Sequence, residues 1–119
     1  MKRKYLGIEW RLILDKLNLN SFIGGWFVGD FEPSLFKNQH VEAGVKFFKS
    51  GDVEPLHKQI LATEITVISE GSVRIGGSVL QKGEVLIIYP GEYADFEALT
   101  DGSLTCLKFP SIPSDKVLK

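Results

Sequence analysis

The sequence predicts an all-β protein, and three observations carry this prediction. Twelve glycines and five prolines interrupt the 119-residue chain at short intervals. Between them lie runs of about 5 to 8 residues rich in Val, Ile, Phe and Thr, the residue types that strands favour. A chain of this length forms one domain, so residues 1–119 are expected to be a single unit. Many short strands in one small domain pack as a sandwich, a jelly roll or a barrel.

The N-terminal third has the least regular pattern. Residues 8–19 fit both a short helix and a strand, and we favour the strand. Residues 24–33 are rich in glycine and aromatic residues, but they lack the spacing and the following helix of a phosphate-binding loop. They predict a structural turn with packing aromatics. Alternatively, if Trp26 and Phe27 are exposed, they predict a contact between subunits.

A regular strand pattern begins at residue 41. Val41, Ala43 and Val45 alternate with polar residues, which predicts a strand with one wetter face. Phe47 continues the apolar alternation, and on this periodicity we expect it in the core.

Further strands follow at short spacing. Residues 64–69 and 73–80 have strand composition, with Gly76-Gly77 closing a tight hairpin in the second stretch. Residues 85–89 are continuously apolar, which predicts a strand buried on both faces. Residues 111–119 carry Pro113 and two lysines, and we expect them to wrap around the outside or to fray.

Composition and charge exclude several classes of function. Fourteen basic and fifteen acidic side chains give a formal net charge of -1, so the chain lacks the basic field expected for binding nucleic acid or an anionic membrane. The basic first residues are not followed by a long apolar run, which favours a cytoplasmic location. The single cysteine, Cys106, has no partner for a disulfide within the chain and is expected to be a small core residue.

One segment is far more specific than the rest of the sequence. Residues 51–71 read GDVEPLHKQILATEITVISEG. They resemble the first motif of the cupin family, in which Gly, His-x-His, Glu and Gly recur at fixed spacing, with Gly51, His57, Glu64 and Gly71 in register. Residues 83–94, GEVLIIYPGEYA, are similar to the second cupin motif, with Ala94 at the position of its histidine.

The resemblance covers roughly residues 41–109 and implies the fold and the assembly. It implies a double-stranded β-helix, the cupin jelly roll, with a short N-terminal extension and a homodimer as the assembly. It also implies the positions that hold a metal ion in that family, namely His57, position 59, Glu64 and position 94. Here Gln59 and Ala94 stand where two histidines are expected.

These replacements leave an incomplete ligand set. Because residues two apart on a strand share a face, His57 and Gln59 point the same way, and a following strand returns Glu64 beside them. An amide oxygen is a feeble ligand for a transition metal and alanine is none, so His57, Glu64 and Gln59 would hold a metal ion only weakly and no cofactor is expected. Asp95 follows Ala94 but faces away on a regular strand, and only a β-bulge would bring it in.

The remaining site residues follow from the same alignment. We expect His57 and Glu64 to be the catalytic pair of any chemistry, with His57 as acid or base and Glu64 orienting its ring. The candidate ligand-binding residues are Gln59, Tyr93, Phe96 and Phe47. Phe96 shares the parity of Ala94 and lines the lumen or packs in the core, whereas Tyr93 is expected at the rim.

Three hypotheses of function remain open. The first is a small-molecule-binding cupin with a degenerate metal site, whose ligand is a saccharide or another small polar metabolite. The second is a metal-independent isomerase or epimerase of sugars or nucleotide sugars, with His57 moving a proton next to a carbonyl. The third is a metal-dependent cupin enzyme that holds a divalent transition metal with an atypical ligand set.

Overall fold

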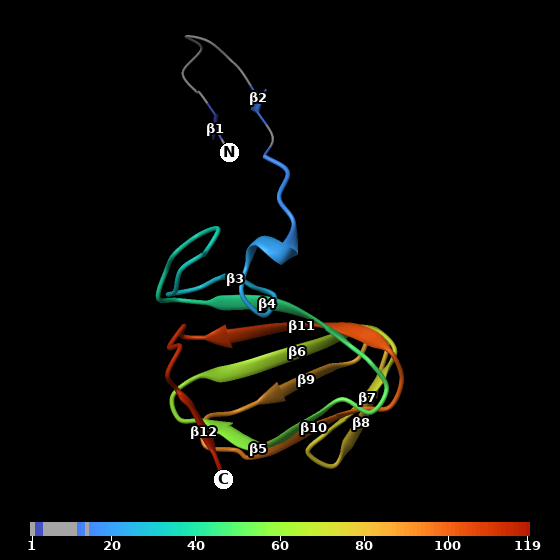
Figure 1. The fold of residues 1–119 in the computed structure, drawn as a ribbon. Coiled ribbons are helices and arrows are strands. Elements are labelled where there is room, and N and C mark those ends of the chain that lie inside the picture. The colour runs from blue at the N-terminus through green and yellow to red at the C-terminus, as the bar shows by residue number, and fades with distance from the viewer. Residues whose placement is uncertain (1, 4–11, 14) are drawn as a thin grey trace.

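Two antiparallel sheets of five strands each face one another and enclose the interior (Figure 1). A computed structural model describes residues 2–3, 12–13 and 15–119 of the chain. The first sheet has the order β12-β5-β10-β7-β8, and its strands are β12 (Lys116–Leu118), β5 (Val53–Gln59), β10 (Ala94–Ala98), β7 (Ser72–Ile75) and β8 (Ser78–Gln81). The second sheet has the order β3-β4-β11-β6-β9, and its strands are β3 (Trp26–Val28), β4 (Glu42–Phe48), β11 (Gly102–Phe109), β6 (Thr63–Glu70) and β9 (Val85–Ile88). The all-β jelly roll predicted from the sequence is confirmed.

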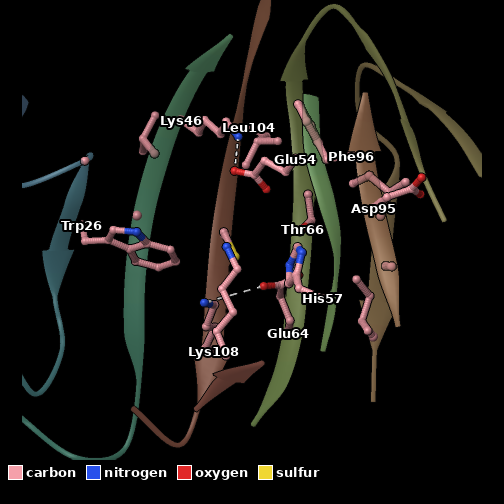
Figure 2. A pocket seen from close by; sticks show the side chains of 18 residues that line it. Trp26, Lys46, Glu54, His57, Glu64, Thr66, Asp95, Phe96, Leu104 and Lys108 are labelled. Carbon is pink, nitrogen blue, oxygen red and sulfur yellow. Dashed lines mark hydrogen bonds and ion pairs between the residues drawn. The ribbon is translucent and has the colours of Figure 1, made fainter. Parts of the chain in front are cut away.

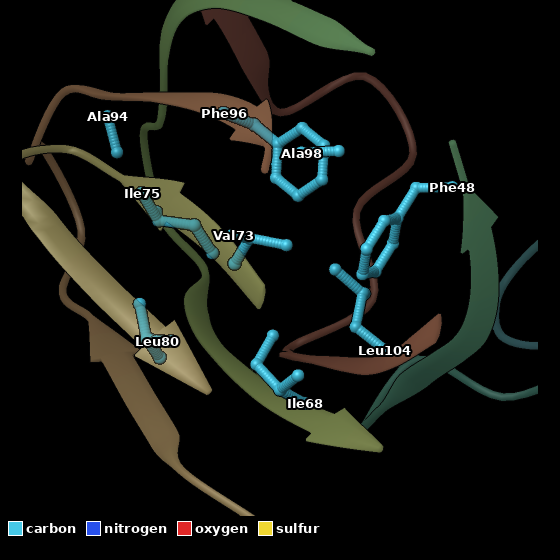
Figure 3. Close-up of a cluster of buried hydrophobic side chains, with 9 residues drawn as sticks. All are labelled: Phe48, Ile68, Val73, Ile75, Leu80, Ala94, Phe96, Ala98 and Leu104. Carbon is cyan, nitrogen blue, oxygen red and sulfur yellow. The ribbon is translucent and has the colours of Figure 1, made fainter. Parts of the chain in front are cut away.

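The apolar core occupies the space between the two sheets (Figure 3). Its buried side chains are Phe48, Ile68, Val73, Ile75, Leu80, Ala94, Phe96, Ala98 and Leu104. Phe48 from the second sheet meets Phe96 from the first edge to face, with ring centroids 5.8 Å apart and planes at 72°, a preferred geometry for aromatic pairs. The core therefore ties the two sheets together and leaves the rest of the interior for other side chains.

The predicted hairpin at Gly76-Gly77 is present. It joins β7 to β8 with Ile75 and Ser78 as the last paired residues. Gly76 has a φ of 57°, in the left-handed region that glycine adopts without a Cβ penalty. The tight turn predicted from the two glycines is therefore present in the structure.

Two predictions about which residues are buried are wrong. Phe47 is 72% exposed, because the inward-facing residues of β4 are Gly44, Lys46 and Phe48. β9 is buried on one face only, since Val85 and Ile87 are 60% and 44% exposed. In each strand apolar residues face inward, Phe48 on β4 and Leu86 and Ile88 on β9, and further apolar residues, Phe47 on β4 and Val85 and Ile87 on β9, line the outside of the second sheet.

The two ends of the chain also form strands. Of residues 8–19, residues 8–11 and 14 lie outside the described part; β2 (Leu12–Ile13) pairs with β1 (Lys2–Arg3), and a short 3-10 helix, η1, spans Leu19–Ser21. The β1–β2 pair stands apart from the barrel (Figure 1). The C-terminal residues do not fray, because β12 pairs with β5 along the edge of the first sheet. Among the described residues, no helix has the length and hydropathy needed to cross a membrane.

Candidate functional site

A cavity of about 130 Å³ lies between the two sheets, next to the core (Figure 2). Eighteen residues line it: Gly24, Trp26, Gly44, Val45, Lys46, Glu54, His57, Glu64, Thr66, Ile75, Ile88, Ala94, Asp95, Phe96, Leu104, Cys106, Lys108 and Lys116. Four of them, Ile75, Ala94, Phe96 and Leu104, also belong to the core. The apolar core thus forms one wall, and charged and uncharged side chains together form the rest of the lining.

The inward-facing residues of two neighbouring strands, β6 and β11, change from charged to apolar along the length of the strands. On β6 the inward residues run from Glu64 through Thr66 to buried Ile68, and on β11 they run from Lys108 through Cys106 to Leu104. Lys108 is the register partner of Glu64, and Cys106 that of Thr66. Paired inward positions on antiparallel strands lie close enough to interact, so both strands place their charged groups at the same end of the interior.

A bulge in β5 aims two side chains into the cavity. Ala94 pairs with His57, but Phe96 pairs with Glu54, so two residues of β5, Pro55 and Leu56, oppose one residue of β10, Asp95. On a regular strand, residues three apart would point to opposite faces. The extra residue removes this conflict, and both His57 and Glu54 line the cavity. The bulge is on β5 and not on β10, and Asp95 remains exposed at the margin of the cavity.

Lys46 and Glu54 form an ion pair across the cavity mouth. The ammonium group of Lys46 also lies 4.3 Å from the centroid of the Phe96 ring, within the range of a cation–π contact. Burial of the Glu54 carboxyl raises its pKa, but the hydrogen bond from Lys46 and the positive charges of Lys46 and Lys116 outweigh this effect, with a smaller contribution from His57 when its ring is protonated. The pKa of Glu54 is therefore below its usual value, and the group carries a negative charge at neutral pH.

A second lysine and glutamate pair lies deeper. Lys108 Nζ is 3.9 Å from Glu64 Oε1, and both side chains are only 14% exposed. Lys108 Nζ also lies 4.9 Å from the Trp26 ring centroid. Trp26 comes this close because Gly44 has no side chain, and a Cβ at that position would lie 2.7 Å from the indole.

Burial raises the pKa of the Cys106 thiol, and the neighbouring Glu64 carboxylate raises it further.

His57 is held by its own strand. Its Nδ1 lies 2.9 Å from the carbonyl oxygen of Pro55, and because a carbonyl only accepts, Nδ1 carries the proton. In the neutral ring the lone pair is then on Nε2. Glu64 was expected to orient this ring, but the hydrogen bond that orients it comes from Pro55, whereas Glu64 contacts Lys108 and Cys106.

A small second cavity of about 10 Å³ gathers the four positions implied by the cupin resemblance. His57, Gln59, Glu64 and Ala94 all line it, together with Lys58, Ile88 and Glu92. Gln59 is 5% exposed, and its Nε2 has no hydrogen-bond partner among the described residues. In the part of the chain that the structure describes, no group of three His, Cys, Asp or Glu side chains is placed to hold a metal ion. The donor set present does not fit a resident transition metal.

Of the three aromatic residues predicted to bind a ligand, only Phe96 lines a cavity. Phe96 lines the main cavity and is 6% exposed, so it serves both the core and the lumen. Tyr93 is 38% exposed and lies between the ammonium groups of Lys58 and Lys119, at 4.9 and 5.2 Å, outside the lining of both cavities. Phe47 lies on the outer face of the second sheet and does not line a cavity.

Sequence reasoning did not find several residues of the cavity wall. Lys46, Lys108 and Lys116 enter it from three strands, and Trp26 enters from a stretch expected to be a structural turn. Gly44 was the available signal for Trp26, because a glycine within a strand often marks the close approach of another group.

Comparisons with known proteins identify the fold. No protein-family model matches the chain, and no curated protein matches it significantly. Among solved structures, an RmlC-like cupin from Shewanella frigidimarina is 21% identical with a TM-score of 0.58, covering 64% of this chain and 71% of its own. KdgF from Halomonas sp. is also 21% identical, with a TM-score of 0.56, covering 63% of this chain and 74% of its own. Oxalate decarboxylase from Bacillus subtilis has a TM-score of 0.62 at 14% identity over 69% of this chain, which spans a quarter of that protein. The chain has the cupin fold.

Proposed function

We propose that this chain of cupin fold binds a small polar metabolite inside the barrel, without a resident metal ion. The observation that carries the proposal is the cavity itself. It combines an apolar wall with converging charged groups, as ligand pockets do, yet the cupin ligand positions supply only His57 and Glu64 as strong donors. A scaffold that keeps the pocket but not the metal ligands favours binding of the ligand by side chains alone.

The charges of the cavity indicate the class of ligand. Lys46 and Lys108 each face a carboxylate, Glu54 and Glu64 respectively. Lys116 also lines the cavity, and within the described part of the chain it takes part in no ion pair. Its charge acts on Glu54 without forming an ion pair with it, so its ammonium group favours a ligand with a carboxylate, and the other polar groups suit hydroxyls. We therefore favour a sugar acid or another hydroxylated organic acid.

The test is a binding panel combined with metal analysis. Protein purified without chelators is screened by calorimetry against neutral sugars, sugar acids and simple organic acids. We expect a sugar acid to bind, and Lys116→Met to weaken that binding about tenfold, roughly the effect of one charge-assisted hydrogen bond. Lys49→Met, at an exposed turn on the β4–β5 connection, is the matched control and should bind like the parent. Stoichiometric Fe, Mn, Ni or Zn, or equal binding by both variants, would contradict the proposal.

A second function is favoured by the state of His57. With Nδ1 donating to Pro55, the basic Nε2 of the neutral ring is available to accept a proton from a carbon next to a carbonyl and to return it. This suits a metal-independent sugar isomerase or epimerase. Incorporation of deuterium from solvent into keto sugars tests it. Exchange should be lost in His57→Ala and kept in His40→Ala, since His40 is exposed and lines neither cavity.

A further inference from the structure

The small cavity adjoins the main one and is lined by Gln59. Four residues, His57, Glu64, Ile88 and Ala94, line both spaces, so a ligand in the main cavity lies next to the small one. At about 10 Å³ the small cavity has the size of one oxygen atom of a water or a hydroxyl. It is a side pocket for a single polar substituent.

The Gln59 amide is fixed at the end of this side pocket. Its backbone carbonyl accepts a hydrogen bond from Gly91 N at 2.8 Å, and its register partner on β12 is Lys116. Gln59 is only 5% exposed, and the Nε2 atom of its side chain has no hydrogen-bond partner among the described residues. Buried amides are normally hydrogen-bonded, so this N–H group is available to an acceptor other than the described residues of the chain.

The hydrogen-bonding groups around the side pocket determine which kind of ligand oxygen can bind there. Gln59 Nε2–H donates only, whereas the Glu64 carboxylate and the free Nε2 of His57 accept. A carboxylate or a carbonyl oxygen would satisfy Gln59 but face two acceptors without a proton to offer. A hydroxyl accepts from Gln59 and donates to Glu64 or His57, so it satisfies both kinds of group.

We propose that Gln59, Glu64 and His57 form a subsite that recognises one hydroxyl group of the ligand. The inference rests on the proposed function, since it assumes a ligand in the main cavity. It makes the ligand a polyhydroxy acid, with its carboxylate toward Lys116 and one hydroxyl in the side pocket.

The test compares one probe with its deoxy forms. D-gluconate, 2-deoxy-D-gluconate and 3-deoxy-D-gluconate are titrated by calorimetry into the parent and into Gln59→Leu. In the parent we expect one deoxy form to bind about 10- to 100-fold more weakly than gluconate, because a site built for a hydroxyl leaves its own polar groups unpaired without it. In Gln59→Leu that difference should fall to less than about threefold.

The outcomes separate this inference from the function on which it rests. Equal binding of all three compounds by the parent, or the same preference in Gln59→Leu, overturns the hydroxyl subsite. If gluconate and its deoxy forms do not bind while another member of the binding panel does, the subsite for polyhydroxy acids is also overturned, and the proposed function stands. If no member of the panel binds, the proposed function fails first.

The unliganded protein gives a second readout. A leucine has nearly the shape of glutamine and leaves no unpaired N–H group, so a binding role predicts that Gln59→Leu melts at the same temperature as the parent or higher. A structural role for the amide predicts a lower melting temperature. Gln81→Leu, at an exposed position on β8, is the matched control for the added apolar side chain.

Discussion

Ala94 shows how a single side chain decides what this pocket can bind. Its register partner across the sheet is His57, and both residues line the small cavity with Gln59 and Glu64. A histidine at position 94 would therefore meet the other three positions. Two of the four positions that the cupin resemblance assigns to metal ligands therefore carry side chains other than histidine, Gln59 and Ala94.

We predict that the double variant Ala94→His with Gln59→His binds a divalent metal. It provides three imidazoles and one carboxylate, a donor set suited to Mn, Ni or Zn. Binding to the folded state alone, at a free metal concentration about 100 times the dissociation constant, stabilises it by about 2.7 kcal/mol. This amounts to several degrees in melting temperature for a domain of this size, measured by thermal unfolding with and without metal.

The parent protein and the single variant Ala94→His are the controls for this experiment. The parent should shift little with any of the three metals. A shift in the parent as large as that of the double variant would show that its own residues already complete a metal site, contrary to the donor set described above.

Cys106 gives a prediction about pH. Burial and the Glu64 carboxylate raise the pKa of its thiol above the ordinary value of 9.0. A group whose pKa is raised on folding contributes its stability below the unfolded pKa and loses it as pH rises above that value. We expect the parent to lose about 1.4 kcal/mol more of its free energy of unfolding than Cys106→Ala between pH 8 and pH 10. Urea unfolding at both pH values measures this difference, and equal losses would show that the folded thiol titrates normally.

Individual residues were predicted well where a motif fixed them and poorly where it did not. His57, Glu64, Gln59 and Ala94 were placed together by their spacing, and the structure brings them to one cavity. Lys108 was missed because nothing local marks an inward-facing lysine: its place in the wall depends on pairing between β11 and β6, which are far apart in sequence.

At the scale of elements, the alternation of apolar and polar residues predicted the period of a strand but not which of its two faces points into the interior. On β4 the polar residues were taken as the solvent face, yet Gly44 and Lys46 line the cavity while Phe47 is exposed. A core-facing strand normally carries its apolar residues inward. A strand that borders a polar cavity reverses this rule, and the sequence of one strand does not reveal which case applies.

The C-terminal strand is attached by one buried carboxylate. Asp115 is 5% exposed, and its side chain accepts hydrogen bonds from Leu61 N at 3.0 and 2.9 Å and from Ala62 N at 2.9 Å. It thereby joins the start of β12 to the turn between β5 and β6. Because Lys116 follows it directly, this anchor also fixes one wall of the cavity.

We predict that Asp115→Ala lowers the free energy of unfolding by about 1–3 kcal/mol, the cost of leaving buried N–H groups without an acceptor. Hydrogen exchange should accelerate at the amides of β12 more than elsewhere. Asp52→Ala is the control, since its exposed carboxylate accepts one backbone N–H, from Lys49, and its loss should cost less. Unchanged exchange in β12 would show that pairing with β5 alone holds the strand.

At the scale of the whole molecule, the two faces of the second sheet differ in an unusual way. The inner face carries Lys46, Lys108 and Glu64 of the cavity, whereas the outer face is uncharged and mostly apolar across four strands. The register aligns Leu107 with Ile65 and Ile65 with Ile87, so the apolar side chains form continuous rows. The outward residues of these strands are Ala43, Val45, Phe47, Thr63, Ile65, Val67, Ser69, Val85, Ile87, Ser103, Thr105, Leu107 and Phe109, and none of them is charged.

We propose that a second copy of this chain covers that face. Contiguous apolar surface of this kind marks interaction sites, and an uncharged sheet face is self-complementary under a two-fold axis. Ile87, 44% exposed on the edge strand β9, lies at the end of one row. Ile87→Glu would bury a carboxylate against its own symmetry copy, which is costly without a partner.

Light scattering coupled to size-exclusion chromatography tests this assembly. We expect the parent to elute as a dimer and Ile87→Glu as a folded monomer. Val79→Glu is the matched control, because Val79 is 50% exposed on β8 of the other sheet, and it should remain dimeric. A monomeric parent at tens of micromolar, or dissociation by Val79→Glu as well, would contradict the proposal. Since the cavity lies on the opposite side of the same sheet, loss of the dimer through Ile87→Glu should leave ligand binding within about twofold of the parent, whereas a site shared between subunits would lose it with the dimer.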